Sequence, residues 1–184
     1  DETAGSQSLK TENFGVRYAV MPGLTVSLEA TSSTAATATA AAVDSEFGLA
    51  ASYSVNVGAG DLAVSAGSAG DETAYGLGFS MNAGAATVAA AYSAGSSDPT
   101  AGPKLENTSM AVSVVFAASD ALSLTAEYGS KDADSTPKGG AKTTTTTDGT
   151  YLKAAYKAGD LTYYVENYSK DFGDKTTLGV TAAF

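Results

Sequence analysis

The sequence has 184 residues, of which 43% are hydrophobic, and a formal net charge of −10 at pH 7. It contains no cysteine and no histidine, which argues against disulfide frameworks, thiol nucleophiles, imidazole bases and the usual zinc or haem ligands. The acidic balance disfavours binding to DNA or RNA. We therefore expect no enzymatic activity, no cofactor and no nucleic-acid partner.

No apolar run approaches the roughly 18–20 residues of a membrane helix. The first ten residues, DETAGSQSLK, lack the charged start and apolar stretch of a signal peptide. The length fits one domain over residues 1–184.

Extended segments dominate the chain from residue 14 onward. In each segment, bulky apolar residues alternate with Gly, Ala, Ser, Thr or charged residues, which is the period of a β-strand with one apolar face. The alternation predicts about eleven strands, over 14–21, 24–30, 47–55, 62–66, 75–81, 88–92, 110–116, 122–128, 152–156, 161–165 and the closing KTTLGVTAAF.

The connections between these segments alternate in length. Short turns are predicted at 22–23, 57–60, 82–84, 117–120 and 158–160, and they alternate with the stretches 31–45, 67–73, 94–107, 130–149 and 169–175. Four of these five stretches are long, and they hold the low-complexity runs TSSTAATATAAA and AKTTTTTDG. Short turns at one end and long polar loops at the other are typical of a bacterial outer-membrane β-barrel.

Aromatic residues of the apolar parity fall into two groups. Phe14, Phe47, Tyr75, Tyr92 and Tyr128 lie toward the long-loop end, and Tyr53, Phe79, Phe116, Tyr156, Tyr163 and Phe184 lie toward the short-turn end. Tyr18 falls between the groups. Two such bands are expected where aromatic rings lie at the two lipid interfaces. A soluble antiparallel sandwich is the alternative, but it explains neither the alternating connection lengths nor the small residues of the second face.

The last strand alternates apolar residues and ends in Phe. It resembles the C-terminal signature that the barrel-assembly machinery recognises, carried here by Leu178, Val180, Ala182 and Phe184. The whole pattern resembles the general porins of Gram-negative bacteria, nearest to alphaproteobacterial ones, with stretches such as DETAYGLGFS and TTLGVTAAF. The resemblance implies a location in the cell outer membrane, contact with outer-membrane lipid, a homotrimer and a barrel of sixteen strands.

The predicted strand count is odd, whereas bacterial single-chain barrels have even strand numbers. With Phe184 at the periplasmic end, Asp1 would be extracellular. We therefore expect the chain to be the later part of a larger porin barrel, without its N-terminal strands. A missed strand within residues 1–10 or inside a long loop is the alternative.

Charged residues on the small-residue parity are the candidate pore-lining groups. They are Arg17, Glu29, Glu127, Lys153, Lys157 and Glu166. If Gly159-Asp160 is a two-residue turn, Lys153 stands opposite Glu166 and the two charges are expected to make contact. With Glu127 they would form a mixed-charge area on the wall.

Acidic residues gather in or beside the long stretches. They are Asp44, Glu46, Asp71, Glu72, Asp98, Glu106, Asp132, Asp134, Asp148, Asp171 and Asp174. Charges of one sign at an entrance enrich counter-ions, so we expect mild cation preference and weak binding of divalent cations. No calcium-loop motif is present.

These patterns favour a porin, a water-filled channel for passive diffusion of small hydrophilic solutes and ions. The alternative is a small complete outer-membrane barrel with a structural or adhesive role. A barrel-borne enzyme is disfavoured because histidine and a convincing acid pair are lacking.

Overall fold

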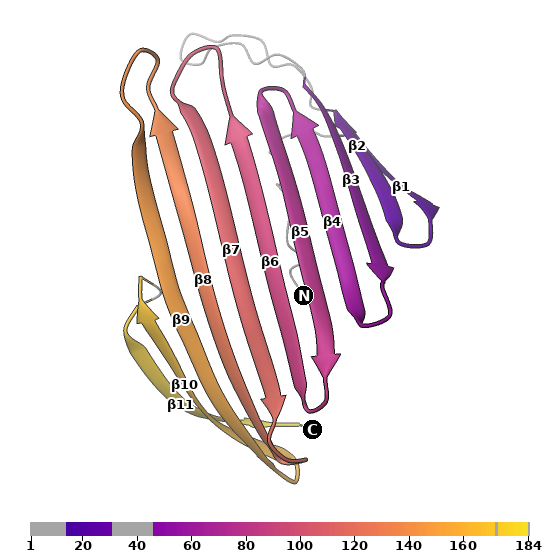
Figure 1. Ribbon diagram of the computed structural model, residues 1–184, viewed down its shortest axis with the longest axis vertical. Helices are drawn as coiled ribbons and strands as arrows, with labels where there is room; N and C mark the ends of the chain where they lie inside the picture. Colours follow the sequence, from indigo (N-terminus) through magenta and orange to yellow (C-terminus); the bar gives the residue numbers. More distant parts are fainter. Residues whose placement is uncertain (1–13, 31–45, 172, 184) are drawn as a thin grey trace.

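The computed structural model describes residues 14–30, 46–171 and 173–183, and these residues form one antiparallel sheet of eleven strands. The strands are β1 (Phe14–Met21), β2 (Leu24–Ala30), β3 (Phe47–Asn56), β4 (Gly60–Ala69), β5 (Glu72–Ala83), β6 (Ala86–Ser97), β7 (Lys104–Ala117), β8 (Leu122–Thr136), β9 (Thr143–Ala158), β10 (Leu161–Lys170) and β11 (Lys175–Ala182). Each strand pairs with the next along the chain (Figure 1). The predicted all-β, antiparallel architecture is therefore confirmed.

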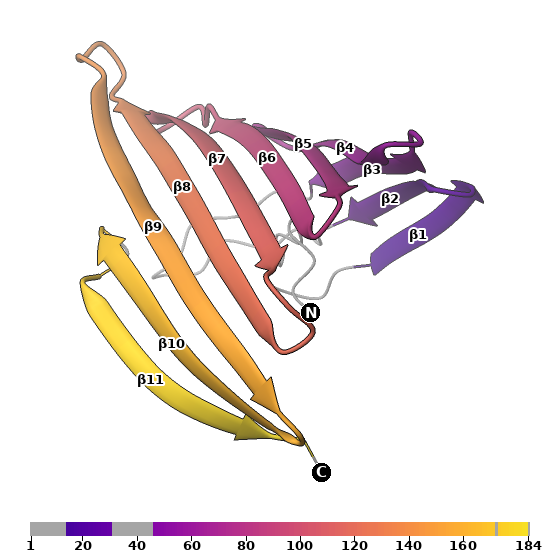
Figure 2. The ribbon, with the colours of Figure 1, turned by 60° about the horizontal axis from the view of Figure 1, so that its bottom comes forward.

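The sheet is curved along its strand order but it is not closed. Figure 2 shows β1 and β11 bending to the same side of the central strands without lying next to each other. Each of these two edge strands therefore has one hydrogen-bonded neighbour among the described residues.

The pairing register keeps most bulky apolar residues on one face of the sheet, here called the apolar face; Leu105 and Val115 of β7 have the opposite parity. Leu28 pairs with Val16 and Leu49, Leu77 pairs with Val64 and Tyr92, and Tyr163 pairs with Tyr156 and Val180. The opposite face, here called the small-residue face, carries the other parity of every strand. Since a slip of one residue would exchange the faces, this continuity shows that the alternation holds across the whole sheet.

No hydrophobic core is present among the described residues, because no side chain of that kind is buried there. Large apolar side chains are exposed instead, for example Phe47 at 70%, Leu49 at 55% and Leu178 at 79%. The sequence-based sandwich alternative needs a second layer packed on this face. The described part of the chain supplies no such layer.

The short connections lie within one or two residues of the predicted turns. Gly159-Asp160 joins β9 to β10, with Ala158 opposite Leu161. Gly159 has a φ of 63°, and a positive φ at the first central position is typical of a type II′ turn, which suits the twist of a hairpin. Pro22-Gly23 joins β1 to β2, and here the positive φ of 82° is at the second central residue, Gly23.

Most of the long connections are shorter in the structure than the sequence predicted. Strand pairing continues into the stretches 67–73, 94–107, 130–149 and 169–175, so the remaining connections are only 70–71, 98–103, 137–142 and 171–174. The threonine run lies at the start of β9 and not in a loop. Cross-strand hydrogen bonds pair the backbone there although the side chains are polar. Hydrophobic alternation therefore cannot reveal this part of the strand.

Some expectations concern residues outside the described ranges. These are the placement of Asp1, the stretch 31–45 with Asp44, any strand within 1–10, and the terminal Phe184. Of the proposed C-terminal signal, Leu178, Val180 and Ala182 lie on the apolar face of β11, opposite Val165, Tyr163 and Leu161.

Candidate functional site

The small-residue face of β3–β6 carries few atoms. A Cβ atom added at Gly67 would lie 3.0 Å from the Cβ of Ala50, and one added at Gly48 would lie 3.2 Å from the Cβ of Ala69. Directly opposite residues usually have their Cβ atoms about 4.5–5.5 Å apart. The close approach is the geometry expected when a sheet curves toward this face.

All six charged residues predicted for this face lie on it. Arg17 pairs with Ser27 and Glu29 pairs with Gly15 and Gly48, so both stand among small residues at the β1–β3 end. Lys157 lies near the β9–β10 turn, opposite Thr162. The other three, Glu127, Lys153 and Glu166, lie close together on β8, β9 and β10.

Lys153 and Glu166 are register partners, as the two-residue turn predicted. The expected ion pair is nevertheless absent from the salt bridges of the described residues. The Lys153 Nζ atom lies 4.7 Å from the centre of the Tyr164 ring, and Glu166 Oε2 accepts a hydrogen bond of 3.0 Å from the Tyr151 hydroxyl. Each of the two charged groups therefore contacts a tyrosine instead of the other charge: Lys153 contacts Tyr164 and Glu166 contacts Tyr151.

These tyrosines were not among the predicted site residues. Tyr151, Tyr164 and Tyr168 lie on the small-residue face, and the rings of Tyr151 and Tyr168 are 4.8 Å apart between centroids at an interplanar angle of 41°. Together with Glu127, Lys153 and Glu166 they form what we call the wall patch. Their parity in the sequence could have revealed them, since they share it with the predicted charges.

The wall patch is ordered in rows across the strands. One row runs from Glu127 on β8 through Tyr151 and Tyr168 to Lys175 on β11. The next row contains Thr125, Lys153, Glu166 and Thr177. In the third row Tyr164 lies over Gly179, whose missing side chain leaves space for the ring. Lys175, like Lys131, Asp61 and Glu72, is a charged residue on this face that the sequence analysis did not assign to it.

The apolar face becomes polar toward the 98–103 and 137–142 connections. Beyond Tyr75, Tyr92 and Tyr128, this face carries a group of hydroxyl and charged residues that we call the polar collar. Its members are Thr73, Ser96, Lys104, Glu106, Asp132, Asp134, Thr144 and Thr146. The rings of Tyr75 and Tyr92, at the boundary, are 6.2 Å apart.

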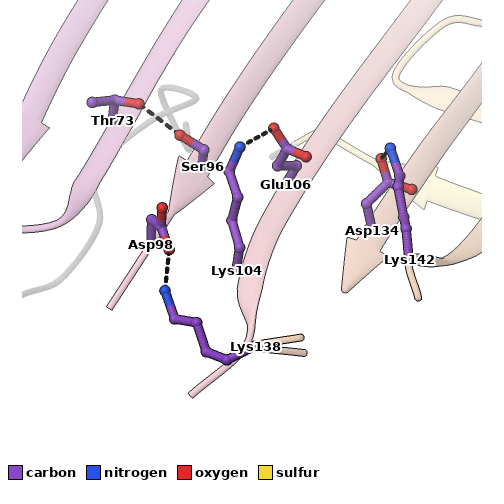
Figure 3. A network of polar contacts seen from close by, with 8 residues as sticks. All are labelled: Thr73, Ser96, Asp98, Lys104, Glu106, Asp134, Lys138 and Lys142. Carbon is purple, nitrogen blue, oxygen red and sulfur yellow. Dashed lines mark hydrogen bonds and ion pairs between the residues drawn. The ribbon is translucent and has the colours of Figure 1, made fainter. Parts of the chain in front are cut away.

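Ion pairs and hydrogen bonds connect the polar collar with the adjoining loops (Figure 3). Lys104 pairs with Glu106 at 2.8 Å and Lys142 pairs with Asp134 at 2.6 Å. Lys138 pairs with Asp98 at 2.7 Å, joining the 98–103 and 137–142 loops. Lys170 pairs with Asp148 at 2.6 Å. Four of the predicted rim carboxylates are thus matched by lysines, which reduces the negative field that they would otherwise produce.

The loop pairs also shift the acid–base equilibria of their members. A hydrogen bond and the positive charge of Lys138 hold the pKa of Asp98 below its ordinary value. The hydrogen bond to Asp134 raises the pKa of Lys142. Both side chains are exposed, so solvent screens these interactions.

The described residues contain no group of three or more Asp and Glu side chains arranged to hold a metal ion. They also contain no helix long and apolar enough to cross a bilayer. The expected weak binding of divalent cations therefore stays a prediction.

No protein-family model matches the sequence, and no curated protein matches it significantly.

Proposed function

We propose that the chain forms part of the wall of a water-filled pore in a Gram-negative outer membrane, which passes small hydrophilic solutes and ions as a porin does. The observation that carries the proposal is the unbroken apolar face of eleven paired strands without a buried hydrophobic core among the described residues. Burying one large aliphatic or aromatic side chain is worth about 1.5–3 kcal/mol. So many exposed side chains of this kind need a non-aqueous surrounding, and lipid supplies one.

The boundary of the apolar face supports lipid more than a covering protein layer. Tyr75, Tyr92 and Tyr128 end the apolar zone, and ion pairs and hydroxyls follow directly on the same face. This order of apolar zone, aromatic residues and charge corresponds to the order of hydrocarbon, interface and water across a bilayer.

Strand length agrees with this assignment. A membrane-spanning strand needs about 9–11 residues when tilted. β3 and β4 each have 10, whereas β7, β8 and β9 have 14, 15 and 16. The additional residues are those that enter the polar collar, so the long strands extend beyond the apolar zone.

Closure of the sheet is part of the proposal. In hydrocarbon, each unpaired backbone group costs several kcal/mol, so open edges at β1 and β11 are not stable there. We propose that the edges pair with each other or with further strands of a larger barrel. The small-residue face then borders water, which is compatible with its Gly, Ala, Ser and charged residues.

The test uses the absence of native cysteine. Leu49→Cys and Ala50→Cys place one fluorophore each on neighbouring residues of opposite faces. In vesicles with brominated lipids, we expect strong quenching at position 49 and weak quenching at position 50, whereas soluble iodide should quench position 50 more. Equal quenching of both positions by each agent would contradict the partition.

Conductance decides between a pore and a closed structural barrel. We expect the protein to form ohmic channels in planar bilayers in potassium chloride. Lipid quenching at position 49 without channels would favour the structural or adhesive barrel instead.

A further inference from the structure

The wall patch contains one row of side chains whose chemistry matches a particular class of solute. Glu127, Tyr151 and Tyr168 stand side by side on β8, β9 and β10. We propose that this row is a weak binding site for organic cations, above all substituted ammonium groups, on their way along the wall. The proposal rests on the proposed pore function, since it names a solute class for the same surface.

The chain itself shows that a ring of the wall patch accepts a cation. The ammonium group of Lys153 lies over Tyr164 at 4.7 Å from the ring centre, within the roughly 6 Å at which cation–π attraction is significant. Its register partner Glu166 is an available carboxylate, yet the ammonium group is on the ring. Tyr151 and Tyr168 offer two more rings, and their tilted contact gives a corner of aromatic surface.

Glu127 supplies the negative charge at this corner. Its carboxylate is exposed and has no hydrogen bond or ion pair within the described part of the chain. The neighbouring Tyr151 hydroxyl already donates to Glu166. At its Glu127 end the row therefore offers a solute ring faces and a carboxylate, while the Tyr151 hydroxyl is already engaged, and this combination favours a cation over a neutral polyol.

On the small-residue face, the site is open toward the ends of the strands at which the 137–142 connection lies. The next register pair on this face consists of Gly129 and Gly149, which have no side chains to cover the row. On its other side Glu127 is opposite Ser113. Lys175 closes the far end of the row beyond Tyr168, so the cation's place is at the Glu127 end, against Tyr151.

The affinity should be low, because conduction requires that a solute leaves as easily as it enters. Cation–π contacts at exposed positions are individually weak, and a dissociation constant on the order of millimolar corresponds to about −4 kcal/mol. A site of this strength would retain organic cations without blocking the pore.

The experiment compares choline with its uncharged isostere 3,3-dimethylbutan-1-ol, by saturation-transfer NMR on the protein in nanodiscs. We expect choline to bind at least fivefold more tightly than the alcohol. Glu127→Gln should remove most of this difference, and Tyr168→Leu should weaken choline binding by a similar factor. Equal binding of both probes to the unaltered protein would overturn the proposal.

Two matched variants control for charge and for folding. Glu29→Gln removes a carboxylate from the same face that stands among glycines instead of tyrosines, and Tyr128→Leu removes a ring from the apolar face next to Glu127. Both should keep the preference for choline. If Glu29→Gln reduced choline binding as much as Glu127→Gln does, general electrostatics and not this row would be responsible.

Failure of this site and failure of the pore are distinguishable. Channels without selective choline binding would refute the site and leave the pore proposal intact. Selective choline binding that depends on Glu127 in a protein without conductance would refute the pore and retain the site.

Discussion

Strands β3–β6 and strands β8–β11 share one apolar face but differ on the opposite face. In β3–β6 that face carries mainly Gly, Ala and Ser, with close backbone approach at Gly48 and Gly67. In β8–β11 it carries the wall patch and further lysines such as Lys131, Lys157 and Lys175. Under the proposed function the apolar zone borders lipid in both regions, which explains why it is similar in both. The other face is free to vary, and specific contacts to solutes are expected in the varied part.

The largest expected change in stability tests the apolar face, which the two regions share. Val64 lies on the apolar face in the middle of β4, and Ala63 is its neighbour on the small-residue face, opposite Ser54 and Gly78. Val64→Lys should lower the free energy of unfolding by about 2–4 kcal/mol, the cost of a lysine facing lipid near the midplane. Ala63→Lys should cost less than about 1 kcal/mol, because its ammonium group reaches water.

Urea titration of both variants refolded in lipid vesicles measures this difference. Similar losses for Val64→Lys and Ala63→Lys would mean that the two faces have similar surroundings. The partition on which the proposed function rests would then be wrong.

A smaller effect is expected from glycines of the two regions. A Cβ atom added at Gly179 would overlap the end of the Tyr164 ring, whereas the nearest atom to one added at Gly78 is 4.0 Å away. Gly179→Ala should therefore push the Tyr164 ring off its rotamer and destabilise the protein by about 0.5–1.5 kcal/mol. Gly78→Ala should be almost neutral. In a Tyr164→Ala background Gly179→Ala should lose its effect, and a persistent loss would place the strain elsewhere.

The hydroxyl groups of the wall patch give the next prediction. Tyr151→Phe removes the hydrogen bond to Glu166 and should cost about 1 kcal/mol, the typical net value of such a bond. Tyr164→Phe keeps the ring under Lys153 and removes a hydroxyl that has no hydrogen bond within the described residues. Its stability in urea titration should match the parent protein, and equal losses for both variants would contradict this difference.

The smallest expected effect concerns the Asp98–Lys138 pair between two loops. Because the folded pKa of Asp98 is lowered, its contribution is fully present above the ordinary aspartate value of about 3.9 and is lost as the pH falls through the lowered folded value. Proteolysis of the 98–103 loop by an acid-active protease should therefore accelerate as the pH falls below about 4.

Asp98→Asn is the control for this last prediction. This variant should be cleaved at the faster rate at every pH and should show no acceleration over the same pH range. The rates are corrected for the protease's own pH profile, measured on an unstructured peptide. An unchanged acceleration in Asp98→Asn would assign the pH dependence to another group.

Sequence reasoning predicted most of the sheet but missed parts of the candidate site for identifiable reasons. Apolar alternation located all eleven strands, and the two-residue turn at Gly159-Asp160 fixed Lys153 opposite Glu166. It missed the strand extensions of β7, β8 and β9, where polar residues such as the threonine run pair without an apolar face. It also missed Tyr151, Tyr164 and Tyr168, because these rings have the small-residue parity, where an aromatic band at the lipid interface does not predict them.

The sequence by itself determined which residues share a face, since strand geometry imposes a period of two on every extended segment. Register, curvature and side-chain partners were decided only by the tertiary structure. Lys153 had a carboxylate directly opposite but lies over Tyr164, and the predicted rim acids Asp98 and Asp134 are paired with Lys138 and Lys142. Such choices depend on side-chain distances across paired strands and between loops, and no local sequence pattern contains those distances.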